Sequence, residues 1–206
     1  MSFDADAARA WVVAAAAVVT ENADRLTQLD AAIGDADHGV NLKRGFTAVV
    51  VALDGFEADG PGAVLVKTGT TLISKVGGAS GPLYGSAFRA IGKALDGPGI
   101  DAAGFGAALR DGLAAIRKLG AAAPGDKTIV DALEPAVEAF AGAADAGFRA
   151  AAEAAADAAE AGAKATAELQ ARKGRASYLG ARSVGHQDPG ATSTTMLGEA
   201  AASTLA

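Results

Sequence analysis

The feature that most constrains this chain is its patterning. Apolar residues recur at helical spacing, and no stretch alternates apolar and polar residues for long enough to form a convincing strand. Half of the residues are hydrophobic but only 5% are aromatic, and alanine and glycine dominate the composition. Alanine is the best helix former. We therefore expect an all-α protein whose helices pack closely through small residues.

About eight helices are predicted from the periodicity and from the residues that flank it. Their approximate ranges are 4–29 (ended by Gly34), 39–55, 62–76, 82–95, 101–119, 128–141, 145–171 and a last helix behind Asp188-Pro189. Pro135 is expected to kink the sixth of them. The connections are short except for residues 172–187, and no repeat or linker divides the chain. This organisation predicts a single domain over residues 1–206, an antiparallel bundle or helical barrel.

Charge and cysteine content exclude several classes of function. The net charge of −6 argues against general binding to nucleic acid or to an anionic membrane, which needs a basic surface. The absence of cysteine excludes a disulfide scaffold, a cysteine nucleophile and a thiolate metal site. The apolar run 10–20 is too short to span a bilayer, and Asp4 and Asp6 precede it where a signal peptide is basic. We expect a cytoplasmic protein with no nucleic-acid or membrane partner.

Three carboxylates crowd a short segment that we call the aspartate turn, residues 30–37. Asp30, Asp35 and Asp37 lie within eight positions, and Gly34 and Gly39 interrupt the segment. Like charges so close together repel unless a cation neutralises them. Carboxylates without sulfur ligands suit Mg²⁺, with Ca²⁺ and Mn²⁺ as alternatives, whereas an EF-hand loop fits poorly because its bidentate Glu is missing. A helix cap beside a solvated acidic turn remains the other interpretation.

A glycine-rich segment, Gly77–Pro82, is a candidate phosphate site that we call the glycine loop. Its two leading glycines allow close backbone approach, consecutive N–H groups can form an anion nest, and a helix start follows. Ser80 adds a hydroxyl donor. Mg²⁺ held by a few carboxylates usually completes its shell with water and substrate phosphates. The two segments together favour a phosphate ligand, although a plain interhelical turn is the alternative for the loop alone.

Residues 120–128 imitate a Walker A motif without matching it. An aspartate separates the second glycine from Lys127, and no strand precedes the segment, so we reject a P-loop. The segment is instead read as a turn in which Asp126 or Thr128 caps the next helix. The sequence does not decide where the Lys127 side chain points.

A basic segment interrupts this acidic chain. Four cations lie within eleven positions: Arg172, Lys173, Arg175 and Arg182. Long connections in compact domains are often lids, and arginine suits bidentate phosphate recognition, although a solvated basic loop is the alternative. With two histidines and no nucleophile–base pair in view, a hydrolase of the Ser-His-Asp type is not expected. The pattern favours metal-assisted phosphoryl transfer.

Five segments, in this order, resemble the nucleotide-binding L subunit of dihydroxyacetone kinases (DhaL): residues 34–45, 76–82, 124–128, 171–180 and 185–193. The resemblance covers nearly the whole chain. It implies a barrel of eight antiparallel α-helices that binds ADP or ATP through two Mg²⁺ at one end. Asp30, Asp35 and Asp37 are the implied magnesium ligands. The implied nucleotide contacts are His38, Gly39, Val40, Asn41, Ala79, Ser80, Gly120, Ile129, Arg175, Asp188, Pro189 and Gly190.

The resemblance also implies roles for these residues. Residues 38–41 with Ala79 and Ser80 would contact phosphates, and Gly120 and Ile129 would lie by the adenine and ribose. Arg175, in a lid loop of residues 172–188, would close over the nucleotide together with residues 188–190. His38, Ser80 and Arg175 are candidates for stabilising the transferring phosphate, and no residue is assigned as a certain catalytic group.

The activity implied by the resemblance is phosphoryl transfer from Mg-bound nucleotide to dihydroxyacetone. A separate K subunit would hold the acceptor covalently, and an M subunit of the phosphotransferase system would rephosphorylate ADP; the chain shows no K domain, which favours this separate-subunit type. A transcriptional regulator is a further partner implied by the family. Two alternatives stay open: a kinase subunit for another ketose or small polyol, and a regulatory nucleotide-binding module without turnover. Whether ADP stays bound or exchanges with ATP is not decided by the sequence.

Overall fold

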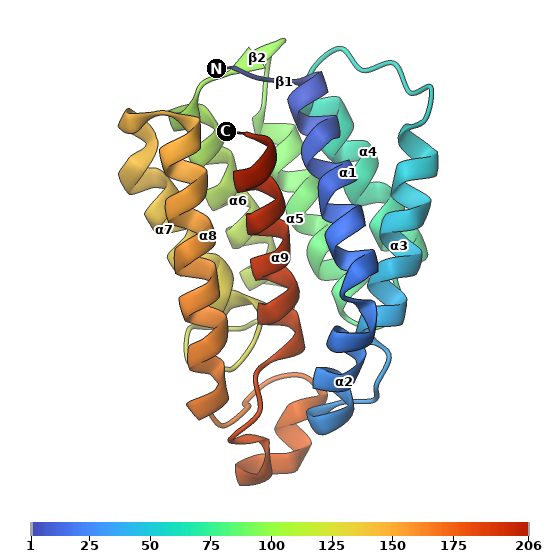
Figure 1. Ribbon diagram of the computed structural model, residues 1–206, viewed down its shortest axis with the longest axis vertical. Coiled ribbons are helices and arrows are strands. Elements are labelled where there is room, and N and C mark those ends of the chain that lie inside the picture. Colours follow the sequence, from blue (N-terminus) through green and yellow to red (C-terminus); the bar gives the residue numbers. More distant parts are fainter. Residues whose placement is uncertain (1, 206) are drawn as a thin grey trace.

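The computed structural model describes residues 2–205, most of which lie in helices that run up and down the long axis of the molecule (Figure 1). The α-helices of this part of the chain are α1 (Ala5–Glu21), α2 (Ala23–Ile33), α3 (His38–Leu53), α4 (Pro61–Lys75), α5 (Ser80–Ala94), α6 (Ala102–Gly120), α7 (Ile129–Ala143), α8 (Phe148–Ala165) and α9 (Pro189–Thr204). Three 3₁₀ segments accompany them: η1 (Ala144–Ala146), η2 (Thr166–Glu168) and η3 (Arg175–Ser183). None of these helices combines the length and apolar character needed to cross a membrane.

The helices form a closed ring. In chain order α1, α3, α4, α5, α6, α7, α8 and α9 each pack against the next, and α9 packs against α1, while α2 extends α1 downward (Figure 1). The closing contact between α9 and α1 includes a hydrogen bond that the Trp11 indole N–H donates to the Leu197 carbonyl over 3.0 Å. The all-α expectation, with about eight antiparallel helices around one core, is therefore confirmed.

Two predicted helix ranges are wrong. The helix predicted over 4–29 breaks at Asn22, whose backbone angles (φ −104°, ψ 11°) are not helical and whose side-chain amide donates to the Val18 carbonyl at 2.9 Å. The chain resumes as α2, which continues to Ile33 and ends at Gly34 as expected. The helix predicted over 145–171 begins at Phe148 and gives way to a 3₁₀ turn after Ala165, where the Thr166 hydroxyl donates to the Ala163 carbonyl.

Other expectations change in detail. Helix α7 continues through Pro135, which lies inside its assigned range. The lid loop was expected without regular structure, yet most of it is the 3₁₀ segment η3. A two-residue strand β1 (Phe3–Asp4) pairs antiparallel with β2 (Gly99–Ile100) and fastens the start of the chain over the top of the ring. A pair this short leaves no alternation in the sequence to detect.

Small residues let neighbouring helices approach closely, as the composition predicts. A Cβ placed on Gly69 of α4 would lie 2.4 Å from the carbonyl oxygen of Gly85 on α5. One placed on Gly92 of α5 would lie 2.6 Å from the carbonyl oxygen of Gly62. Two glycine pairs, seven residues apart along each helix, thus set the contact between α4 and α5.

Aromatic side chains fill the barrel near the strand pair. We call this group the aromatic cluster: Phe3, Trp11, Phe105, Phe140 and Phe148. Phe105 is its centre, with ring centroids 4.5 Å from Phe3 and 5.4 to 5.9 Å from the other three. Offset and edge-to-face contacts at these distances stabilise a core beyond the area that they bury. The end of the barrel that carries the strand pair is therefore packed with hydrophobic side chains.

The alternation of helix direction determines what gathers at the other end. Because successive members of the ring run in opposite directions, α3, α5, α7 and α9 all begin at the end away from the aromatic cluster (Figure 1). A helix N-terminus carries a partial positive charge and exposes unpaired N–H groups. Four such N-termini at one end favour an anionic ligand there.

Candidate functional site

A cleft of about 630 Å³ opens at the end where these four helices begin. This volume is within the range of small-molecule sites, about 300–1,000 Å³. The first turns of α3, α5, α7 and α9 border it, together with the aspartate turn, the glycine loop and part of the lid loop. The cleft therefore unites the segments that sequence reasoning singled out separately.

The aspartate turn presents its three carboxylates to a common point. Asp30, Asp35 and Asp37 each offer one oxygen, and these oxygens lie within 4.8 Å of one another. Asp30 is buried at the end of α2, and its Oδ2 accepts hydrogen bonds from the backbone N–H groups of Asp37 and His38, at 2.9 and 3.2 Å. Three converging carboxylates with no sulfur or imidazole among them fit a hard divalent cation such as Mg²⁺.

Glycine and one strained residue give this turn its shape. A Cβ on Gly34 would lie 2.0 Å from Asp30 Oδ1, so any side chain there would displace the buried carboxylate. Ala36, between the two exposed aspartates, has a left-handed φ of 61°. A non-glycine residue in this region costs about 1–2 kcal/mol, and such strain tends to occur at functional sites.

The lid loop crosses the cleft and contacts the aspartate turn. Arg175 Nε lies 2.8 Å from Asp35 Oδ2, which forms an ion pair between η3 and the turn. Both side chains are partly exposed, so the pair contributes little to stability. Its consequence is positional, because it holds the lid arginine over the carboxylates.

Buried hydroxyl groups fix His38 at the first turn of α3. Ser80 Oγ lies 3.0 Å from His38 Nδ1, and Ser193 Oγ lies 2.9 Å from His38 Nε2. Ser193 also contacts the Tyr84 hydroxyl at 2.7 Å. Burial lowers the pKa of His38 against the opposing charges of Asp30 and Asp37, which keeps the imidazole neutral. The result is a rigid link from the glycine loop through α3 to α9.

The N-cap of α9 is a second buried carboxylate in the cleft. Asp188 Oδ2 accepts the Ala191 N–H at 2.7 Å, as expected for an N-cap before Pro189. Burial raises the pKa of Asp188 to about 7.

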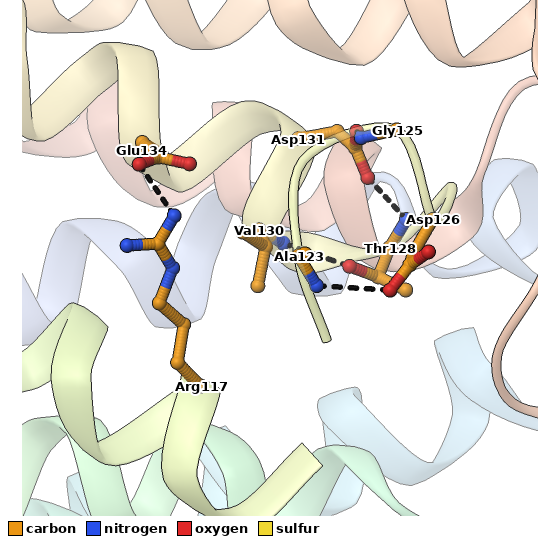
Figure 2. A network of polar contacts seen from close by, with 8 residues as sticks. All are labelled: Arg117, Ala123, Gly125, Asp126, Thr128, Val130, Asp131 and Glu134. Carbon is orange, nitrogen blue, oxygen red and sulfur yellow. Dashed lines mark hydrogen bonds and ion pairs between the residues drawn. The ribbon is translucent and has the colours of Figure 1, made fainter. Parts of the chain in front are cut away.

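The start of α7 is held by a dense set of caps, drawn in Figure 2. The Thr128 hydroxyl accepts the Val130 N–H at 3.1 Å, and Asp131 accepts the N–H groups of Thr128 and Gly125 at 2.7 and 2.6 Å. Asp126 instead closes the preceding turn by accepting the Ala123 N–H at 2.9 Å. Of the two predicted caps, Thr128 is therefore the one that starts the helix.

Most residues implied by the resemblance border the cleft. They are Asp30, Asp35, Asp37, His38, Ala79, Ser80, Gly120, Ile129, Arg175, Asp188, Pro189 and Gly190. Three do not: Gly39 lies against the Ala23 carbonyl, Val40 is exposed, and Asn41 is buried and accepts a hydrogen bond from Arg44.

Sequence reasoning missed other lining residues. They are chiefly apolar, Ile33, Leu83, Ile116 and Val130, with the exposed Tyr178 from the lid loop. The apolar ones follow the same helical spacing as the core, so no signal in the sequence separates them from it.

The chain matches known proteins over most of its length. The model of the DAK2 domain family matches residues 32–203. The chain is 42% identical to the ADP-binding subunit DhaL of PEP-dependent dihydroxyacetone kinase 1 from Listeria innocua, over 96% of this chain and 95% of the relative. It is also 42% identical to the corresponding DhaL subunit from Escherichia coli, over 91% and 90%.

Longer proteins contain a similar unit. The D-erythrulose kinase of Mycolicibacterium smegmatis is 39% identical over 89% of this chain, which spans 32% of that relative. The crystal structure of the dihydroxyacetone kinase of C. freundii with AMP-PNP and Mg²⁺ superposes with a TM-score of 0.71 at 27% identity, and the match covers 95% of this chain and 33% of that one. These matches show that the chain belongs to the DAK2 domain family, together with the DhaL subunits of dihydroxyacetone kinases.

Proposed function

We propose that the cleft binds ADP and ATP together with two Mg²⁺ held by Asp30, Asp35 and Asp37. The observation that carries this proposal is the convergence of three carboxylate oxygens within 4.8 Å at the end where four helices begin. The three carboxylates would repel a phosphate unless a cation lay between them. The helix N-termini favour an anion but do not neutralise the carboxylates. A Mg-nucleotide satisfies both groups at once.

The walls of the cleft suit the two halves of a nucleotide. The polyphosphate would lie against Ala79, Ser80 and His38, which border the cleft at the starts of α3 and α5. The adenine and ribose would lie by Gly120 and Ile129. Leu83, Ile116 and Val130 supply an apolar surface on the same side.

Phosphoryl transfer in this site would depend on positioning and charge. Bound Mg²⁺ would supply neutralisation of the phosphate oxygens. Ser80 presents a hydroxyl beside the N-terminus of α5, and Arg175 lies over the aspartate turn where it can donate to a phosphate. The lid loop, with Asp188 to Gly190, would close the cleft and exclude water.

The chain would act as the kinase subunit that carries the nucleotide. The acceptor dihydroxyacetone would be held covalently by a separate K subunit, and an M subunit of the phosphotransferase system would return the phosphoryl group to ADP. Support comes from the PEP-dependent and ADP-binding names of relatives that this chain matches over nearly their whole length.

Calorimetry of ADP binding with and without Mg²⁺ tests the site. Asp35→Asn should weaken Mg-ADP binding by at least about tenfold, because it removes one of the three charges that hold the cation. Asp157→Asn, on the exposed face of α8, is the matched control and should bind as the parent does. Unchanged affinity in Asp35→Asn, or ADP binding that ignores Mg²⁺, would contradict the assignment.

A second acceptor is favoured by one observation, the similarity to a D-erythrulose kinase. In this version the nucleotide site is the same and the acceptor is another ketose or small polyol. Assays that pair the chain with different K-type partners distinguish the two, because the acceptor should follow the partner. Mg-dependent ADP binding without transfer to any partner would favour a regulatory module instead.

A further inference from the structure

Lys127, the lysine of the imitated Walker A segment, does not offer its ammonium group to the cleft. Its side chain is 1% exposed, and Nζ donates to four backbone carbonyl oxygens. The acceptors are Thr166 (2.8 Å), Leu169 (3.0 Å), Ser183 (2.7 Å) and His186 (2.5 Å). An ammonium group has three N–H donors, so these four oxygens share all of its hydrogen-bonding capacity.

Two of the four acceptors precede the lid loop, and the other two belong to its second half. Thr166 and Leu169 precede η3, whereas Ser183 and His186 follow or end it. Other hydrogen bonds join the segment before η3 to the segment at its end. The Gly185 N–H donates to the Ala167 carbonyl at 2.7 Å, and the Ala171 N–H donates to Ser183 Oγ at 2.9 Å. Together with these bonds, the Lys127 ammonium group joins the two ends of the lid loop, which we call the base of the loop.

The contacts of Lys127 continue to the N-cap of α9. Thr166, whose carbonyl accepts from Lys127, also accepts the Asp188 N–H on its hydroxyl at 2.9 Å. The turn before α7 that carries Lys127 is itself fixed, because the capping hydrogen bonds drawn in Figure 2 hold residues 123–131. The Arg172 N–H further donates to the Asp126 carbonyl at 3.1 Å.

This arrangement is costly, which distinguishes it from a surface lysine. Burial lowers the pKa of Lys127, and Asp188 opposes that shift. The backbone of Lys127 has a left-handed φ of 63°, unusual for a long side chain. A buried charge is tolerated only when it is well hydrogen-bonded, and strain persists only where the surroundings enforce it. Lys127 meets both conditions, because four carbonyl oxygens accept from its ammonium group and its neighbours fix the turn that carries it.

We propose that Lys127 is a positioning residue that closes the base of the lid loop, so that Arg175 stays over the aspartate turn and bound nucleotide leaves slowly. Lys127 touches neither the phosphates nor the metal ligands in this assignment. It acts through the lid loop and through the N-cap of α9. The part concerning release rests on the proposed nucleotide function, and the part concerning the loop does not.

Limited proteolysis tests the loop without any nucleotide, because the loop carries its own trypsin sites at Arg172, Lys173, Arg175 and Arg182. In Lys127→Met the initial rate of cleavage at these sites should rise by about tenfold, since cleavage reports how often the loop opens. Lys93→Met, exposed at the other end of α5, is the matched control and should match the parent. Lys127→Arg keeps the charge and should recover part of the protection.

Release of a fluorescent ADP analogue in the presence of Mg²⁺ tests the second part. The dissociation rate should rise by about tenfold in Lys127→Met and not in Lys93→Met. Faster cleavage without faster release would overturn the link to retention. Absence of nucleotide binding in the parent would instead refute the proposed function and leave the proteolysis result to decide the role of Lys127.

Folding is checked by circular dichroism and by cleavage outside the loop. If Lys127→Met does not fold, Ser183→Ala replaces it, because it removes the hydroxyl that accepts from Ala171 and donates to Gly180 in the same base. Equal cleavage of the loop in the folded parent and in folded Lys127→Met or Ser183→Ala would overturn the proposal.

Discussion

The two ends of the barrel are built from different chemistry. At the strand end, the aromatic cluster packs ring against ring around Phe105. At the cleft end, buried positions hold polar groups, among them His38, Lys127 and Asp188, and three non-glycine residues take left-handed backbone angles. Hydrophobic packing at one end supplies stability, and polar positioning at the other uses some of it. Stability and ligand binding should therefore separate by position along the barrel axis.

The largest expected effect on stability is at the aromatic cluster. Phe105→Ala should lower the free energy of unfolding by about 3–5 kcal/mol, since it removes the ring that contacts four others and leaves a cavity. Chemical denaturation measures this loss, with Val51→Ala at an exposed position of α3 as the control. Mg-ADP affinity of the folded variant should stay unchanged. A matching loss of affinity would contradict the separation of the two ends.

The converse test is in the aspartate turn. Gly34→Ala places a Cβ 2.0 Å from Asp30 Oδ1 and must displace that carboxylate. We expect Mg-ADP affinity to fall by about 10–100-fold, while the free energy of unfolding changes less than in Phe105→Ala. Calorimetry and denaturation measure the two quantities. Gly142→Ala in α7, where a Cβ meets nothing within 4 Å, is the control: it should leave affinity unchanged and raise the free energy of unfolding by up to about 1 kcal/mol.

The helices and caps that form the cleft end could be predicted from the sequence, but the hydrogen bonds between distant segments there could not. Helix-forming composition, glycine and proline positions and the Asp188-Pro189 cap are local signals, so the ring of helices and the start of α9 were predictable. The break at Asn22 was not, because a side-chain bond to Val18 competes with a continuing helix by a small energy difference. The four acceptors of Lys127 were hidden for another reason: they are backbone carbonyls 39 to 59 residues away, which no side-chain pattern marks.

A further effect on stability concerns pH. Burial raises the pKa of Asp188 from 3.8 to about 7, so between these values the folded chain binds more protons than the unfolded chain. The free energy of unfolding without Mg²⁺ should therefore fall as pH rises from about 4 to 7, at up to about 1.4 kcal/mol per pH unit. Asp188→Asn keeps a capping side chain but cannot ionise, and its stability curve should lose this slope. A slope unchanged in the variant would show that another group titrates.

The smallest effect on stability is expected for the lid ion pair. Arg175→Gln removes an exposed contact with Asp35, so the free energy of unfolding should change by less than about 1 kcal/mol. Release of Mg-ADP should nevertheless become faster, because the charge over the aspartate turn is lost. Stopped-flow fluorescence measures release, with Arg149→Gln on α8 as the control. Destabilisation as large as that of Phe105→Ala would refute the division between the two ends.

The closure of the ring by α9 has a consequence for the order in which the molecule is made. Helix α9 is the last member of the ring in chain order, it packs against α1, and it carries Asp188 to Gly190 into the cleft. During synthesis the aspartate turn and the glycine loop emerge first, but the wall that faces them arrives only when α9 docks. In the proposed function, the nucleotide site is therefore complete only once α9 has docked and the barrel has closed.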